Sequence, residues 1–134
     1  MYSCKYFKIE ELVPKNIARK YGERAWQFLD ERALITLDIL REKFGKIKIN
    51  DYLFGGSNQY RGFRPPNCTI GADLSQHRFG RAFDCIFLEV DVEVVRTFIL
   101  ENPDEFSFIN ALELDVSWLH FDTRNCKRTM TFKP

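Results

Sequence analysis

The sequence predicts an α+β fold, a single domain in which helices flank a central antiparallel sheet. One observation is a long apolar stripe of helical period between residues 23 and 44. A second is a set of short apolar or alternating runs with the length and composition of strands. A third is that these elements follow one another without the regular alternation of a parallel α/β protein. The length of 134 residues suits one domain over residues 1–134, and such a chain buries a core without disulfides.

Two segments are predicted to be helices. In residues 23–44 apolar side chains recur every three or four residues, and Gly45 follows as a natural C-cap. This stripe consists of Trp26, Leu29, Ala33, Leu37, Leu40 and Phe44. Residues 91–102 form the second predicted helix, because four apolar residues share one face and Pro103 follows its end.

The strands are predicted from alternation and from apolar runs between turn residues. Residues 80–88 form an apolar run that indicates a strand near the middle of the sheet. The other predicted strands are residues 46–53, 60–63, 106–114 and 118–123, the last two joined by a tight turn at residues 115–117. Residues 1–22 are predicted to be an N-terminal arm, and residues 67–76 a polar loop at the rim of a cleft.

Composition and charge argue against several classes of function. The formal net charge is +1, so phosphate neutralisation is not expected to drive binding to nucleic acid. No apolar run is long enough to span a membrane, and residues 1–8 lack the apolar region of a secretory signal. We therefore expect no nucleic-acid partner and no membrane insertion.

The four cysteines are Cys4, Cys68, Cys85 and Cys126. None of them forms a Cys-x-x-Cys pair, so the sequence does not support a zinc site made of cysteines. Without a signal peptide all four are expected to be reduced thiols. Cys85 lies in an apolar run and is expected to be a small buried side chain.

The only two histidines of the chain lie near acidic residues. His77 precedes Asp84, with Gly80 between them to let the chain bend, and His120 is followed by Asp122. Two imidazoles and a carboxylate suit a catalytic zinc ion, which takes three protein ligands and leaves a fourth position for water. We therefore expect His77, Asp84 and His120 to bind a metal ion. Ser75 or Asp122 is a candidate to orient the imidazoles through hydrogen bonds.

An alternative interpretation needs no metal ion. Asp84 lies in an apolar run, and a buried carboxylate is costly unless a cation or hydrogen-bond donors reach it. Arg78 or Arg81 is near enough in the sequence to be that cation. In this case His77 and His120 bind no metal ion.

Three motifs together resemble a known family. Residues 75–84 match the pattern Ser-x-His-x-x-Gly-x-Ala-x-Asp, residues 118–120 match Trp-x-His, and residues 60–66 read Tyr-Arg-Gly-Phe-Arg-Pro-Pro. With these motifs the chain resembles the zinc D-alanyl-D-alanine carboxypeptidases, peptidoglycan peptidases that include small phage endolysins and share a fold with the hedgehog signalling domain. The resemblance covers about residues 45–125. It implies a hedgehog/DD-peptidase-like fold and one zinc ion bound by the three candidate ligands.

The resemblance leaves the catalytic base open. Many members of the family place a Glu or Asp three residues before the last histidine, where this chain has Ser117. The nearest carboxylates are Glu113 and Asp115, which flank the predicted turn. We expect one of them to be the base, and favour Glu113 because it ends a strand beside the strand of His120.

The resemblance also implies residues that bind the substrate. Arg64 best matches the arginine of the family and is expected to bind a peptide carboxylate or a developing oxyanion. Arg61 is the second choice. Trp118, two residues before His120, is expected either to line the site or to cap the core. For Arg61 the alternative is a surface charge stacked on Tyr60 or Phe63.

The motifs therefore predict a zinc metallopeptidase, either a carboxypeptidase or an endopeptidase, that hydrolyses stem or cross-link peptides of peptidoglycan. Its expected partners are that substrate and a phage or host protein. Its expected location is the cytoplasm of a bacterial host until release, or the virion. The alternative function is a non-catalytic structural or binding phage protein that keeps the fold, with or without a metal site, and Ser117 at the usual position of the base favours it.

Overall fold

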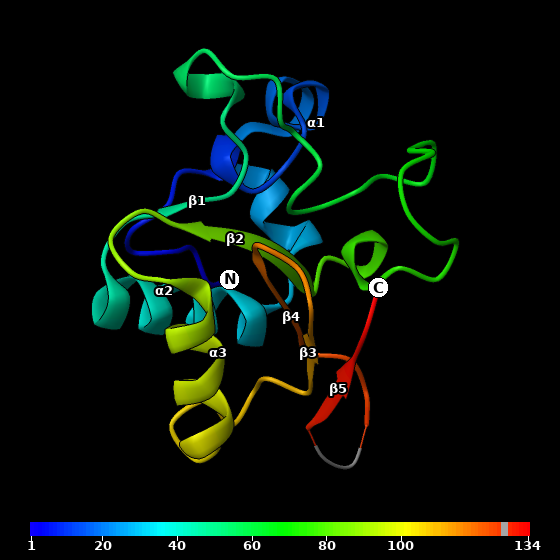
Figure 1. Ribbon diagram of the computed structural model, residues 1–134. Helices are drawn as coiled ribbons and strands as arrows, with labels where there is room; N and C mark the ends of the chain where they lie inside the picture. Colours follow the sequence, from blue (N-terminus) through cyan, green and yellow to red (C-terminus); the bar gives the residue numbers. More distant parts are fainter. Residues whose placement is uncertain (127–128) are drawn as a thin grey trace.

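A mixed sheet with the strand order β1-β2-β4-β3-β5 lies at the centre of the fold (Figure 1). The computed structural model describes residues 1–126 and 129–134. Within these residues the strands are, in sheet order, Ile47–Lys48 (β1), Ala82–Phe87 (β2), Leu119–Asp122 (β4), Ala111–Glu113 (β3) and Met130–Phe132 (β5). With three α-helices in the same residues they form a single α+β domain, as the sequence predicts.

The strands pair antiparallel except at β5. Strand β2 is antiparallel to both β1 and β4, and β4 is antiparallel to β3. Strand β5 instead runs parallel to β3, with Glu113 opposite Phe132. The prediction of an antiparallel sheet is therefore correct for β1–β4 and wrong for β5. Three residues are too few to show an alternating pattern, so β5 depends on its pairing with β3.

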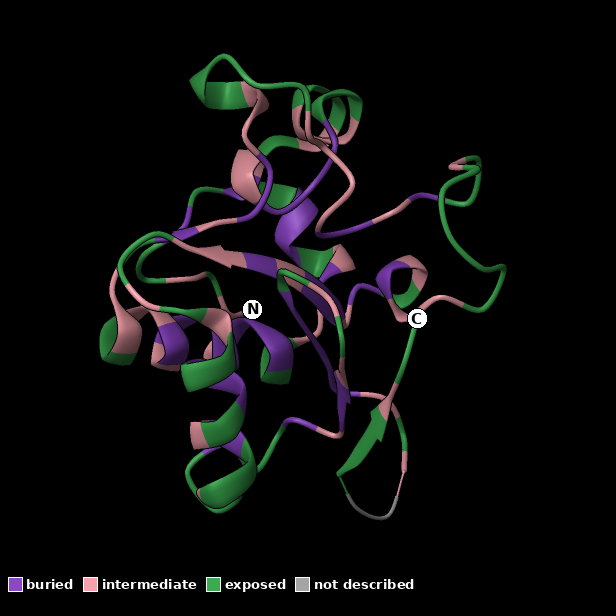
Figure 2. Cartoon of the chain, in the orientation of Figure 1, coloured by how far each residue is buried: buried purple, intermediate pink, exposed green. Residues whose placement is uncertain are grey.

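Helices α2 (Glu31–Phe44) and α3 (Val92–Glu101) pack against the sheet, α2 on β2 and α3 on β4. Phe44 of α2 joins these layers, because its ring meets Phe87 of β2 at 6.0 Å and Phe98 of α3 at 5.7 Å between centroids, both edge-on. Buried residues follow strands β2, β4 and β3 and the inner faces of the helices, whereas β5 is largely exposed (Figure 2). Within the described residues no helix has the length and apolar character needed to cross a bilayer.

The single long helix predicted around α2 is in fact two helices. A 3₁₀-helix, η2 (Gly22–Phe28), comes first, and Leu29 after it is extended, with φ −110° and ψ 136°. The backbone N–H of Asp30 then donates to the carbonyl of Gly80 at 2.8 Å. The side chain of Asp30 caps α2 by accepting from the backbone N–H of Arg32 at 2.8 Å. This tertiary hydrogen bond and the cap outweigh the continuous apolar period.

The predicted N-terminal arm contributes to the core. It contains a 3₁₀-helix, η1 (Ile9–Glu11), where the sequence predicts a short helical turn. It also contains helix α1 (Lys15–Tyr21), which the sequence pattern does not predict. Leu12 and Val13 between these helices are fully buried. The arm therefore belongs to the domain.

Several predicted strands are shorter than expected. Residues 46–53 pair only at β1, after which the chain turns into the 3₁₀-helix η3 (Tyr52–Phe54). Residues 106–114 pair only at β3. Residues 80–88 and 118–123 contain β2 and β4, and residues 91–102 contain α3, so these three predictions are confirmed.

The prediction of a strand over residues 60–63 is wrong. This segment is instead held by isolated backbone hydrogen bonds, from the N–H of Phe63 to the carbonyl of Leu12 at 2.8 Å and from the N–H of Asp84 to the carbonyl of Arg61 at 2.8 Å. Its partners lie on two different elements, so no ladder forms. The segment nevertheless lies against β2, which brings its side chains to the candidate site.

Candidate metal centre

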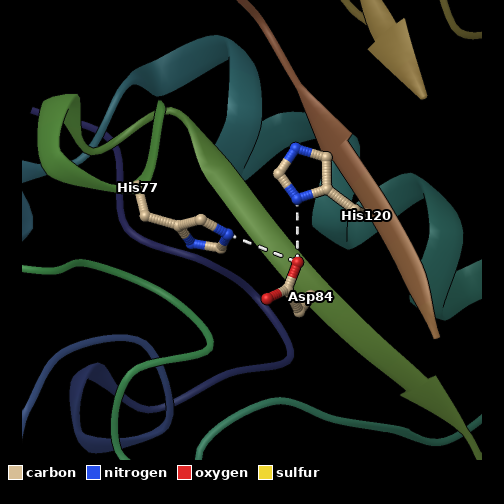
Figure 3. Close-up of side chains that lie close together, drawn as sticks. All are labelled: His77, Asp84 and His120. Carbon is tan, nitrogen blue, oxygen red and sulfur yellow. Dashed lines mark hydrogen bonds and ion pairs between the residues drawn. The ribbon is translucent and has the colours of Figure 1, made fainter. Parts of the chain in front are cut away.

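The three predicted metal ligands come together on one face of the sheet (Figure 3). Asp84 of β2 and His120 of β4 are register partners across the antiparallel pair, so their side chains point to the same face. His77 lies in η4 (Gln76–Phe79), the short 3₁₀-helix that precedes β2. Both imidazole rings point toward the carboxylate of Asp84.

One carboxylate oxygen meets both imidazoles. Oδ1 of Asp84 lies 2.8 Å from Nδ1 of His120 and 3.3 Å from Nε2 of His77. One ligand atom from each of the three residues lies within 4.8 Å of the other two. Both histidines are buried, with 2% of His77 and 7% of His120 exposed. Two nitrogens and an oxygen at this spacing can hold a metal ion of the type that imidazole and carboxylate prefer.

A backbone carbonyl fixes the orientation of His77. Nδ1 lies 2.8 Å from the carbonyl oxygen of Gly62, and because a carbonyl only accepts, Nδ1 carries the proton. The other ring nitrogen, Nε2, faces Asp84. Residue 62 must be glycine, because a Cβ there would lie 2.2 Å from the carbonyl oxygen of Leu12.

A buried carboxylate fixes the orientation of His120. Nε2 of His120 lies 3.0 Å from Oδ2 of Asp122, two residues further along β4, and Asp122 is fully buried. An Nε2–H donated to Asp122 leaves Nδ1 to face Asp84. Of the two residues expected to orient the imidazoles, Asp122 makes this contact, whereas Ser75 lines the pocket described below.

Hydrogen bonds keep these groups charged despite burial. Burial alone would raise the pKa of Asp84, but hydrogen bonds from His120 and His77 outweigh it and hold the pKa well below its usual range. Burial alone would lower the pKa of His120, but Asp122 and Asp84 raise it to about 9. In the metal-free protein His120 is therefore protonated at neutral pH, and a metal ion held by Nδ1 would take the place of that proton.

Gly80 sets the turn between His77 and Asp84. Its φ is +69°, and a Cβ at this position would lie 1.8 Å from the carbonyl oxygen of Phe28. Both the conformation and the close approach require glycine. The carbonyl of Gly80 also accepts the N–H of Asp30, which ties the turn to the start of α2.

Arg64 is the arginine that reaches Asp84. Its Nη2 lies 3.5 Å from Oδ2 of Asp84, and its Nε donates to the carbonyl of Tyr60 at 2.8 Å. Its backbone N–H donates to the carbonyl of His77 at 3.1 Å. The segment before Pro65 is thus fixed to η4 and places a guanidinium beside the candidate ligands.

The alternative interpretation, in which Arg78 or Arg81 pairs with Asp84, is not supported, since the described contacts of both arginines lie elsewhere. Arg78 instead donates to three carbonyls of the loop before η4, and Arg81 lies over the ring of Phe79 at 5.0 Å. The carbonyls that Arg78 contacts belong to Pro66, Cys68 and Ala72. Arg78 therefore shapes the loop that forms one wall of the site.

A pocket of about 490 Å³ opens over the three candidate ligands. Arg64 and Trp118 line it, and so does Glu113 at the end of β3. Continuing the register of β3 and β4 by one residue places Glu113 opposite His120. The structure therefore brings three further predicted residues to the pocket over the candidate ligands.

Two other predicted residues lie elsewhere. Asp115 is exposed in the turn after β3, has a φ of 61°, and pairs with Lys133 at 3.2 Å. The guanidinium of Arg61 donates to the carbonyl of Ile49 at 3.3 Å. Neither Asp115 nor Arg61 lines the pocket.

Arg124 and Phe132 line the pocket but are not among the predicted site residues. Arg124 follows Asp122 by two positions, and residues two apart in extended chain share a face, so this spacing is a usable signal. Phe132 lies on β5, a three-residue strand that no sequence pattern predicts, so the sequence holds no signal for Phe132.

The cysteines take no part in the candidate centre. Cys4, Cys68 and Cys85 are free thiols, as expected, and Cys85 is fully buried in β2. The Sγ of Cys126 lies 3.5 Å from the carbonyl oxygen of Asn110.

Comparisons of the chain with protein-family models, with curated proteins and with solved structures gave no match. The family resemblance therefore depends on the motif residues themselves. The contacts described above are the evidence for what those residues do.

Proposed function

We propose that the chain is a zinc metallopeptidase that hydrolyses stem or cross-link peptides of peptidoglycan. The observation that carries the proposal is the fixed orientation of both imidazoles. His77 is held through its second nitrogen by the carbonyl of Gly62, and His120 through its second nitrogen by Asp122. One nitrogen of each ring then faces Asp84. Hydrogen bonds of this kind orient the histidine ligands of zinc sites.

The donor set supports zinc as the metal. Two imidazole nitrogens and one carboxylate oxygen are the ligands of many catalytic zinc sites, in which water or substrate occupies the fourth position. Zinc bound there supplies a Lewis acid and lowers the pKa of a bound water molecule. Glu113 lines the same pocket and has no ion-pair partner among the described residues, so its carboxylate is able to accept a proton from the attacking water.

The pocket lining supports a peptide substrate. The guanidinium of Arg64 suits a carbonyl oxygen or a terminal carboxylate. Ile70, Leu74 and Trp118 add exposed apolar surface to the lining of the pocket, which suits a peptide with small apolar side chains. The resemblance to the peptidase family assigns this peptide to peptidoglycan. A phage lysin released from the host cytoplasm, or carried on a virion, would meet that substrate.

Metal content is the first test of the proposal. Elemental analysis of the purified protein is expected to give about one zinc ion per chain, and His77→Ala is expected to lose it because one of three ligands is gone. Digestion of purified peptidoglycan, followed by mass spectrometry of the released peptides, then identifies the bond that is cut. A wild-type protein that takes up no metal even after zinc is added would overturn the proposal.

Glu113→Gln separates catalysis from metal binding. The amide cannot accept a proton, so we expect zinc to be retained while the rate of hydrolysis falls by about 10²–10⁴-fold. Asp115→Asn is the matched control, because it removes a nearby carboxylate that is exposed and paired with Lys133 outside the pocket. Its rate is expected to be unchanged.

The same experiment addresses the alternative function. A wild-type protein that binds zinc and digests no peptidoglycan would favour a structural or binding phage protein that keeps the fold. Equal rates in wild type and Glu113→Gln would remove Glu113 as the base.

A further inference from the structure

Arg124 makes contacts that lead to His120. Its Nε and Nη2 donate to the two carboxylate oxygens of Asp122 at 2.8 and 2.7 Å. Its backbone N–H donates to Oδ1 of the same carboxylate at 3.1 Å. A further hydrogen bond to this carboxylate comes from Nε2 of His120 at 3.0 Å. Among the described residues, Asp122 is thus shared between Arg124 and His120.

The carboxylate of Asp122 needs both of these partners because it is buried. Asp122 is fully buried, and a buried carboxylate is costly unless a cation pairs with it and its lone pairs are filled. The planar guanidinium fork fixes both the position and the plane of the carboxylate, which a point charge does not. With that plane fixed, Oδ2 of Asp122 faces Nε2 of His120, and the ring is turned so that Nδ1 lies 2.8 Å from Asp84.

Strand β5 completes the surroundings of His120. The guanidinium carbon of Arg124 lies 5.0 Å from the centroid of the Phe132 ring, within the range of a cation–π contact. The Phe132 ring meets the imidazole of His120 edge-on, with 5.5 Å between centroids and 80° between planes. Asp122, Arg124, Phe132 and His120 therefore form a closed ring of contacts, and His120 is held from two sides.

We infer that Arg124 is a positioning residue of the metal centre. Acting through Asp122 and Phe132, it holds His120 in the orientation that presents Nδ1 to the metal ion, and so sets the metal affinity of the site. This role needs no contact between Arg124 and a substrate. The inference rests on the metal site of the proposed function but not on peptidase activity.

Metal affinity measured by competition with a chromogenic chelator tests this role without an activity assay. Arg124→Ala is expected to weaken zinc binding by about 10–100-fold, the usual effect of removing a group that orients a histidine ligand. Arg124→Lys keeps the charge but not the fork, so it is expected to recover only part of that loss. In the cobalt-substituted protein both variants are expected to shift the visible absorption bands, because these bands report the geometry of the ligands.

Asp30 and Arg32 supply a matched control. Arg32 makes the same three donations to Asp30, at 2.8 Å from its backbone N–H, 3.1 Å from Nε and 2.8 Å from Nη2. Neither residue lines the pocket over the candidate ligands. Arg32→Ala is therefore expected to leave zinc affinity and the cobalt spectrum unchanged.

Wild-type affinity together with an unchanged cobalt spectrum in Arg124→Ala would overturn the inference. If Arg124→Ala does not fold, Phe132→Leu is the second variant, because it removes the ring between Arg124 and His120. Normal zinc affinity in both Phe132→Leu and Arg124→Lys would then overturn the inference. Zinc binding that depends on Arg124 in a protein that digests no peptidoglycan would support the inference and overturn the proposed function. A wild-type protein that binds no metal would overturn both.

Discussion

The pattern Asp-x-Arg occurs at residues 30–32 and again at residues 122–124. In both places the arginine donates from its backbone N–H, its Nε and its Nη2 to the aspartate two residues earlier. The local geometry is the same, but the two pairs serve different parts of the molecule. Asp30 starts helix α2, whereas Asp122 orients His120 at the candidate metal centre.

Burial accounts for the difference between the two pairs. The side chains of Arg32 and Asp30 are 45% and 19% exposed, whereas those of Arg124 and Asp122 are 26% and 0% exposed. Water screens the first pair, so its net contribution to stability is small. The second pair includes a carboxylate that water does not reach, so removing either partner leaves an uncompensated charge. The same sequence pattern is therefore a helix cap in one context and a support for a candidate metal ligand in the other.

Removing the two aspartates is expected to give the largest contrast. In Asp122→Ala, Arg124 loses its carboxylate and His120 loses its partner in a buried position, so we expect the free energy of unfolding to fall by about 3–5 kcal/mol. In Asp30→Ala the loss is that of a helix N-cap and an exposed pair, about 1 kcal/mol. Urea unfolding of both variants with a chelator present measures the difference without a contribution from bound metal. Equal losses would show that burial does not separate the two pairs.

The pH dependence of stability is expected to separate the two regions as well. The pKa of His120 in the folded protein is about 9, above the value of about 6.5 in an unfolded chain. Protonation of His120 therefore stabilises the metal-free fold fully below about pH 6.5, and this contribution is lost as the pH rises from about 6.5 to 9. From the size of the shift it is at most about 3 kcal/mol.

The contribution of Asp30 to stability is lost at acid pH, whereas that of His120 is lost at alkaline pH. Burial alone would raise the pKa of Asp30, but hydrogen bonds from Arg32 lower it, so its contribution is present near neutral pH and is lost as the pH falls below about 4.

Urea unfolding with a chelator, at pH values from 5 to 9.5, checks the His120 contribution. His120→Gln is the control that should remove the dependence between about pH 6.5 and 9. Wild-type stability that is flat over this interval would contradict the raised pKa.

Elements of the fold that carry their own sequence pattern are predicted, whereas elements that depend on contacts distant in sequence are not. Strands β2 and β4 and helix α3 are found because each carries its own apolar pattern. The break before α2 is missed because it depends on the hydrogen bond from Asp30 to the carbonyl of Gly80, distant in sequence. Strand β5 is missed because only its pairing with β3 identifies it.

The residues of the candidate site divide in the same way, into those with a signal in the sequence and those whose role depends on distant contacts. His77, Asp84 and His120 are identified together because the only two histidines of the chain and this aspartate belong to recognisable motifs, and two of the three lie on paired strands. The choice between Glu113 and Asp115 depends on where β3 ends and on the pairing of Asp115 with Lys133, which only the folded chain shows. The roles of Gly62 and Phe132 likewise depend on chain segments that meet only in the folded protein.

The smallest expected effect concerns the exposed pair alone. Arg32→Gln keeps the backbone N–H that Asp30 accepts and removes only the guanidinium fork, so the loss of stability should be about 0.2–1 kcal/mol. High salt should reduce this loss further, since a screening length of about 3 Å at 1 M shields exposed charges. Arg124→Gln, measured in parallel with a chelator, should keep its full effect in 1 M salt because Asp122 is buried. If salt reduced both effects alike, Asp122 would be reached by water, and the orientation of His120 would need another cause.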